Sequence, residues 1–203
     1  MYFRGSVIMS AISALEIALW DIKGKALGVP VYELLGGKTR DRIRTYCSGL
    51  SNFDMSDDEM AKEFAVLKEK GFTASKVFIP VNNTRGDGSD ELFQSKVKIA
   101  ADKVKKVREA VGDNFDLIVE VHRCMSTPEA VAFAQEIEKY HPMVLEDPIV
   151  PDNVDAMAYV AEKTNIPIAT GERFTYFNEF EILMQRQAAR YVRPDVCAVG
   201  GIN

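Results

Sequence analysis

The sequence predicts an α/β fold in which about six parallel strands form part of a (β/α) barrel of the TIM type. After residue 40, short β-rich runs alternate with longer helical patterns, which is typical of βα units on a parallel sheet. Acidic residues recur with this rhythm, since 26 residues separate Glu120 from Glu146 and Glu146 from Glu172. No Gly-rich phosphate loop opens a helix, which disfavours the competing doubly wound sheet.

The first 40 residues predict two helices that precede the barrel. Apolar residues recur on a broad helical face over 10–26, and Gly28 and Pro30 end the pattern, so we expect a largely buried helix. A short helix is expected at 31–35, before a pair of glycines. The charged link 38–42 predicts a domain boundary near residue 40, which gives domains 1–40 and 41–203.

The remaining residues predict the barrel units in order. Strands are expected at 43–47, 74–79, 117–121, 143–146, 167–170 and 191–192. Helices are expected at about 56–70, 89–111, 127–140, 154–164 and 177–187. Six strands do not close a ring, and a complete barrel of this type has about 250 residues, so we expect part of a larger protein.

Composition excludes several classes of protein. The 203 residues are 47% hydrophobic and 27% charged, as in a globular protein with a sizeable core. The net charge of −5 gives no general attraction to nucleic acid or to an anionic membrane. Three distant cysteines, no apolar run of about 18 residues and no secretory signal indicate a soluble cytoplasmic protein. We expect a homo-oligomer, whose subunit number stays open.

Three acidic residues fall where strands are expected to end: Glu120, Glu146 and Glu172. Neighbouring parallel strands lie about 4.8 Å apart, so these carboxylates can converge on one cation. Ligands that are all oxygen and all anionic suit Mg²⁺, or Mn²⁺, better than zinc. The alternative is that they are ordinary solvated acids in loops.

Three further residues are candidates for the chemistry. His122 follows Glu120 by two and is expected on the same side of the sheet, as a general acid or a structural histidine. Lys76 lies inside an apolar run and could bind a substrate carboxylate, act as a base or reach solvent. Asp195 could support a metal site, orient a histidine or form a turn after Pro194.

Several motifs in order resemble the mandelate racemase branch of the enolase superfamily. They are SAISALEIALWDIKGK at 10–25, LEDP at 145–148, GER at 171–173, RPD at 193–195 and GG at 200–201. Within that branch, EVH at 120–122 is similar to the acid-x-His step of galactonate and gluconate dehydratases. The resemblance implies Glu120, Glu146 and Glu172 as ligands of an essential Mg²⁺, and His122 as the acid that helps a hydroxyl leave.

The resemblance also implies a function. A hydro-lyase of this kind converts a sugar acid to a 2-keto-3-deoxy acid through a metal-stabilised enediolate. In the family the base is a histidine of the seventh strand, paired with an aspartate that matches Asp195. The chain stops at Asn203, so we expect this chain alone to lack the base. Residues 1–40 are expected to be the last helices of an α+β capping domain.

Two other functions stay open. A racemase or epimerase of the same superfamily could use Lys76 and the missing histidine as bases on the two faces of the substrate. Lys76-Val77-Phe78 departs from the Lys-x-Lys of relatives that use two lysines, which weakens a cycloisomerase or epimerase built on that pair. The other is a non-catalytic half-barrel that works only with a partner chain.

The chain also differs from the family at one implied ligand, since Glu120 stands where many relatives have Asp.

Overall fold

The computed structural model describes residues 5–48, 55–79 and 92–203, which divide into two compact units. The sheet unit comprises Thr45–Thr170 and Leu183–Val192. The terminal unit comprises Met1–Arg44, Gly171–Ile182 and Arg193–Asn203. This division follows spatial contacts and not chain order, so the predicted domain boundary near residue 40 stays a prediction.

The sheet unit is built on five parallel strands. They are β1 (Ala74–Phe78), β2 (Asp116–Glu120), β3 (Val144–Glu146), β4 (Ile168–Thr170) and β5 (Tyr191–Val192). Each strand pairs with the next one along the chain, in the order β1-β2-β3-β4-β5. Such an order never reverses, whereas a doubly wound sheet reverses at its switch point. The parallel, sequential sheet is that of a partial barrel, as predicted.

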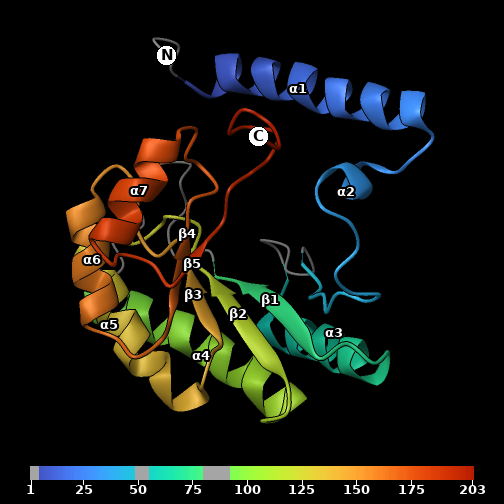
Figure 1. Ribbon diagram of the computed structural model, residues 1–203. Coiled ribbons are helices and arrows are strands. Elements are labelled where there is room, and N and C mark those ends of the chain that lie inside the picture. The colour runs from blue at the N-terminus through green and yellow to red at the C-terminus, as the bar shows by residue number, and fades with distance from the viewer. Residues whose placement is uncertain (1–4, 49–54, 80–91) are drawn as a thin grey trace. The chain divides into compact units, whose positions relative to one another are not determined.

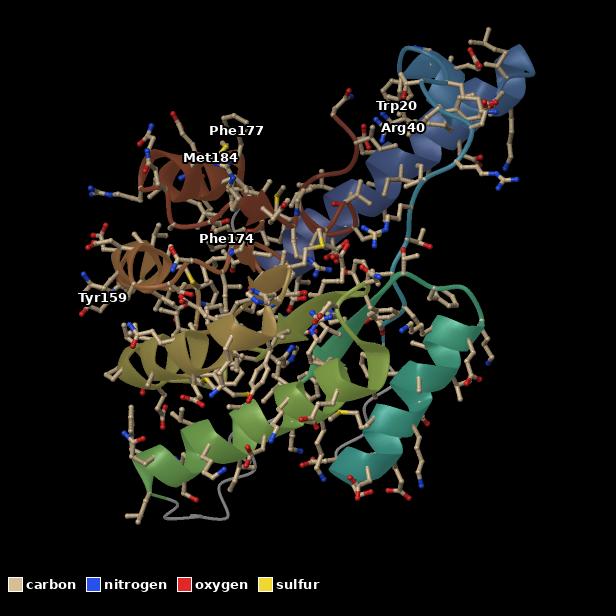
Figure 2. All side chains as sticks on the ribbon, turned by 90° about the horizontal axis from the view of Figure 1, so that it is seen from below. Trp20, Arg40, Tyr159, Phe174, Phe177 and Met184 are labelled. Atoms are coloured by element: carbon tan, nitrogen blue, oxygen red, sulfur yellow. The ribbon has the colours of Figure 1, made fainter. Side chains whose placement is uncertain are left out.

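Helices connect the strands and lie along one side of them (Figure 1). They are α3 (Asp57–Glu69) before β1, α4 (Phe93–Val111), α5 (Thr127–Ile137) with the 3₁₀ turn η1 (Glu138–Tyr140), and α6 (Val154–Glu162). The helix α7 (Phe177–Gln185) follows β4 along the chain. Among these helices, α3 packs against α4, α4 against α5, and α5 against α6, in the order of the strands. Tyr159 on α6 points away from the sheet and is half exposed (Figure 2).

The strands alternate between two faces, which creates two different environments. One face buries Val77, Leu117, Val119, Leu145 and Ile168, the apolar surface expected beneath a layer of helices. The opposite face carries a smaller buried cluster, formed by Ala74, Ile118, Val144 and Ala169. On this second face, polar side chains follow the cluster towards the carboxyl ends of the strands. The apolar cluster therefore forms the floor of the candidate site.

Local sequence signals explain where three helices begin. Ser56 and Glu59 form a capping box at the start of α3, and Ser126 and Glu129 form another at α5. The side chain of Asn153 accepts a hydrogen bond from the backbone of Ala156 and caps α6. These caps satisfy amides that have no partner inside the helix.

One predicted strand, 43–47, is corrected by the structure. Only Cys47 pairs, in a parallel bridge with Ser75, so the sheet has five strands instead of about six in the described residues. The preceding residues 41–46 are exposed and give no buried face for a longer ladder. The predicted helix start at 89 lies outside the described residues, as do 80–91 and 49–54.

The terminal unit contains α1 (Ser6–Leu27) and α2 (Val31–Leu34). Gly28 ends α1 in a left-handed conformation, with φ 69°. The helix was expected to be largely buried, but Leu15, Leu19 and Ile22 are 71%, 66% and 60% exposed. The apolar stripe is therefore exposed. Within the described residues, α1 makes contacts through a different face, which carries Ser13 and Glu16. None of the described helices is long and apolar enough to cross a membrane.

That contacting face of α1 binds the last residues of the chain. The Ser13 hydroxyl is fully buried, donates to the carbonyl of Met9 and accepts from the backbone of Gly200. The carboxylate of Glu16 accepts from the backbone amides of Ile202 and Asn203, at 2.7 and 3.3 Å. Polar residues inside the apolar motif of α1 therefore hold a backbone segment that is remote in sequence.

Candidate active site

Two glutamates end neighbouring strands in register. Glu120 is the last residue of β2 and is paired with Glu146, the last residue of β3. Parallel neighbours lie about 4.8 Å apart and residues in register face the same side, so the two carboxylates share one site. Only 6% of Glu120 and 0% of Glu146 is exposed. We call these two residues the carboxylate pair.

Lys76 lies between the two carboxylates of the pair. It comes from β1, in register with Ile118, and its side chain is 12% exposed. Its Nζ lies 2.6 Å from Glu120 Oε2 and 3.3 Å from Glu146 Oε1. The lysine therefore neither reaches solvent nor points into the apolar floor, but forms a buried ion pair with both strand ends.

The electrostatics of Glu120 combine two opposing effects. Burial raises the pKa of its carboxyl, but hydrogen bonds from Lys76 and His122 lower it by more, so the pKa lies below its ordinary value. The carboxyl is consequently ionised at neutral pH. An ionised, buried carboxylate is what a metal ligand of this type requires.

The ring of His122 is held at both nitrogens. Nδ1 lies 2.9 Å from Glu120 Oε1, and Nε2 lies 2.7 Å from Nη2 of Arg123. A guanidinium can only donate, so Nε2 accepts and Nδ1 donates to the carboxylate. The ring also meets the edge of Phe78, with centroids 5.6 Å apart. With 46% of its side chain exposed, His122 is the most accessible member of the site.

Arg123 and Asp147 belong to this site, although the sequence did not single them out. Nη1 of Arg123 lies 2.9 Å from Asp147 Oδ2, and the backbone amide of Arg123 donates to the carbonyl of Asp147. His122, Arg123 and Asp147 all have positive φ, at 55°, 68° and 43°. Such conformations are strained for these residues and concentrate at functional sites. For these two residues, the only signal in the sequence is the position of Asp147 directly after Glu146.

Glu172 and Asp195 lie in the terminal unit. Glu172 follows β4 after Gly171, whose φ is 123° and where a Cβ would lie 2.8 Å from Phe180 Cε1, so this turn requires glycine. Asp195 is exposed and its Oδ1 accepts from the backbone of Cys197, as in an Asx turn. The predicted roles of Glu172 as a ligand and Asp195 as a partner of histidine stay predictions.

The carboxylate pair fits a hard divalent cation. Its donors are buried carboxylate oxygens on adjacent strand ends, with no thiolate among them, which suits Mg²⁺ or Mn²⁺. Lys76 brings one positive charge to the two negative charges of the pair. Within these three residues, one negative charge remains for a cation to neutralise.

Residues 59–203 match the family described as enolase C-terminal domain-like. Residues 1–36 match the N-terminal domain of mandelate racemase and muconate lactonizing enzyme. The chain belongs to the enolase superfamily. Within it, the two matches place the chain in the mandelate racemase/muconate lactonizing branch, which confirms the resemblance seen in the motifs.

Relatives in this superfamily cover the whole chain. The D-galactonate dehydratase of Ralstonia pickettii is 35% identical over 206 residues, which are 100% of this chain and 51% of the relative. The D-xylonate dehydratase of Haloferax volcanii is also 35% identical, over 98% of this chain and 50% of the relative. The chain thus spans about half the length of the curated relatives it matches.

Solved structures of enolase-superfamily proteins share the fold. A superfamily member from Salmonella Typhimurium matches with a TM-score of 0.88 at 34% identity, over 98% of this chain and 55% of that one. The 3,6-anhydro-D-galactonate cycloisomerase of Zobellia galactanivorans matches with a TM-score of 0.84 at 30% identity, over 98% and 52%. At these identities the partial barrel is the shared architecture.

Proposed function

We propose that this chain carries the metal-binding and acid residues of a Mg²⁺-dependent sugar-acid dehydratase, a hydro-lyase. Its substrate would be an aldonate such as galactonate, xylonate or gluconate, and its product a 2-keto-3-deoxy acid. The observation that carries the proposal is the buried carboxylate pair with His122 hydrogen-bonded to it. The names of two relatives that match this chain, galactonate and xylonate dehydratase, support the same chemistry.

Glu120, Glu146 and Glu172 are the residues that would hold the cation, Mg²⁺ or alternatively Mn²⁺. Enolase-superfamily enzymes generally depend on a divalent metal, and the carboxylate pair has the donor chemistry for one. When bound, the ion would neutralise the carboxylate of the acid and the charge that develops as the adjacent proton is removed.

His122 is proposed as the acid that protonates the departing hydroxyl. Glu120 holds the ring through Nδ1, which fixes its orientation and leaves Nε2 as the nitrogen that can face a substrate. Nε2 accepts from Arg123, so Arg123 must move and Nε2 must take up a proton from solvent before the ring can act as an acid there. A general acid of this kind contributes about 10²-fold or more to a rate.

Lys76 and Asp195 are proposed in supporting roles. As an ammonium beside the carboxylate pair, Lys76 is placed to bind the carboxylate of a sugar acid. Asp195 would orient the histidine base of the complete enzyme. We also propose a homo-oligomeric cytoplasmic enzyme, whose subunit number light scattering would measure.

The experiment replaces the matched half of the Ralstonia pickettii relative with this chain, because the chain spans about half of it. The chimera is incubated with Mg²⁺ and C5 and C6 aldonates, and 2-keto-3-deoxy acid is measured. We expect keto acid from at least one aldonate. A folded, Mg²⁺-binding chimera that makes none would contradict the proposal, and isomerised acid without keto acid would favour a racemase or epimerase.

Two histidine variants make this experiment specific. His122→Asn should lower keto-acid formation by about 10²-fold or more while Mg²⁺ binding is retained. His141→Asn is the matched control, since His141 is the other histidine and also has positive φ, at 47°. Asn tolerates this left-handed conformation, so neither change should disturb the backbone. Equal losses in both variants would remove His122 from the mechanism.

A further inference from the structure

The carboxylate pair has a charge problem whenever no cation is bound. Two carboxylates on adjacent strands are almost fully buried, 6% and 0% exposed, so water screens their repulsion weakly. Neither can turn away, because strand register fixes both on the same face. The fold therefore needs a positive charge in this space before any metal arrives.

Lys76 supplies that charge from the neighbouring strand. Its Cα is in register with Ile118, which lies two residues before Glu120. The long side chain must therefore extend along the sheet to place Nζ between the two strand ends. The contacts of 2.6 and 3.3 Å engage one oxygen of each glutamate. The guanidinium of Arg123 contacts Asp147 and Nε2 of His122.

From this geometry we infer that Lys76 is an internal counter-ion, which holds the carboxylate pair together without a metal and competes with a divalent cation for it. The inference rests on the proposed metal site. A bound cation would take over the carboxylate oxygens that Nζ contacts, and the ammonium would then be available to the carboxylate of an acid substrate. The lysine thereby links cation binding to substrate binding.

This role has an unusual signature, because removing the charge has opposite effects on two quantities. Lys76→Met keeps the length of the side chain but removes the ammonium. Without metal, the two carboxylates lose this ammonium and repel each other more strongly, which should lower the Tm by about 5 °C or more. The affinity for Mg²⁺ should rise, by about tenfold, because a competing positive charge is gone. A lysine that only supports packing would lower both.

The experiment measures Tm in EDTA and the Mg²⁺ dissociation constant by calorimetry, for the 203-residue chain and its variants. Lys96→Met is the matched control, since Lys96 also pairs with a glutamate, at 3.7 Å from Glu129, and is 20% exposed. It should leave Mg²⁺ affinity unchanged. Lys76→Arg keeps the charge and should keep the affinity near that of the wild type.

The possible outcomes separate the inference from the proposed function. Lys76→Met that binds Mg²⁺ no more tightly than the wild type overturns the inference. If Lys76→Met unfolds in EDTA, Mg²⁺ should restore its fold, and failure of that rescue also overturns it. If the wild type binds no divalent cation, the proposed metal site fails. Even then, the counter-ion role predicts that Lys76→Met has a lower Tm than the wild type, and that the double variant Lys76→Met/Glu120→Gln recovers this Tm.

Discussion

At the scale of single residues, Arg108 is a buried side chain of the sheet unit that binds several backbone carbonyls. It is 8% exposed, and its guanidinium donates to the backbone carbonyls of Gly112, Phe115, Tyr140 and His141. Burial lowers the pKa of this group, and backbone carbonyls accept from its Nε, Nη1 and Nη2. Arg108 therefore ties the end of α4 to the loops that lead into β2 and β3.

Replacing Arg108 by Met should destabilise the chain by about 3 kcal/mol, because buried carbonyls lose their donor. Urea unfolding followed by circular dichroism measures this change. Arg186→Met serves as the comparison, since Arg186 is 60% exposed and pairs with Asp155 on the surface. That change should cost less than about 0.5 kcal/mol. Similar losses for both variants would contradict the role given to Arg108.

Other residues show what a sequence can reveal at this scale. The positions of Glu120 and Glu146 at strand ends follow from apolar runs that stop at an acid. The ion pair of Lys76 with both glutamates could not be read from the sequence, since it depends on strand register and on the reach of a flexible side chain. The clamp between Arg123 and Asp147 depends on left-handed backbone, which no residue-type pattern specifies.

At the scale of elements, the helix caps carry a prediction about pH. Glu129 closes the capping box of α5, and its carboxylate accepts from the backbone and hydroxyl of Ser126. Burial raises its pKa, but these hydrogen bonds and the charge of Lys96 lower it by more. Its folded pKa is thus below the ordinary value of about 4.3. A carboxyl whose pKa is depressed by folding stabilises the fold at pH values above its ordinary pKa. This stabilisation is lost as the pH falls through the folded pKa.

Acid titration of stability tests this cap. The free energy of unfolding of the wild type should fall as pH drops below about 4.3, and Glu129→Gln should lose less over the same range. The variant should be less stable at pH 7, where the charged cap is complete. Urea midpoints measured between pH 7 and 3 provide the data. Parallel curves for wild type and variant would show that Glu129 adds no pH-dependent stability.

Elements with a strong periodic pattern were predicted closely, and the two errors have physical causes. The five strands β1 to β5 and the helices between them lie where the alternation of apolar runs placed them. The run 43–47 has β-forming residues but no buried face, so it shortens to one bridge at Cys47. The apolar pattern of α1 predicted its helix correctly, but not the exposure of that apolar face.

At the scale of the whole molecule, the strand order defines the partial barrel. Five parallel strands in sequential order, with helices between them, place the ends of β2 and β3 side by side. The solved structures that match this chain share its partial-barrel fold. Fold and family were predictable from the motifs. The substrate was not predictable. The chain spans about half the length of its relatives, and the contacts that would select one sugar acid over another cannot be read from composition.

The central claim is that Glu120, Glu146 and Glu172 bind one divalent cation. Calorimetric titration with Mg²⁺ tests it directly, on the wild type and on Glu120→Gln, Glu146→Gln and Glu172→Gln. Glu179→Gln is the control, since Glu179 accepts from the backbone of Thr175 and Tyr176. We predict one bound ion for the wild type and the control, and at least about tenfold weaker binding for each of the three variants. Binding that is undiminished in all three variants, or absent from the wild type, would contradict the claim.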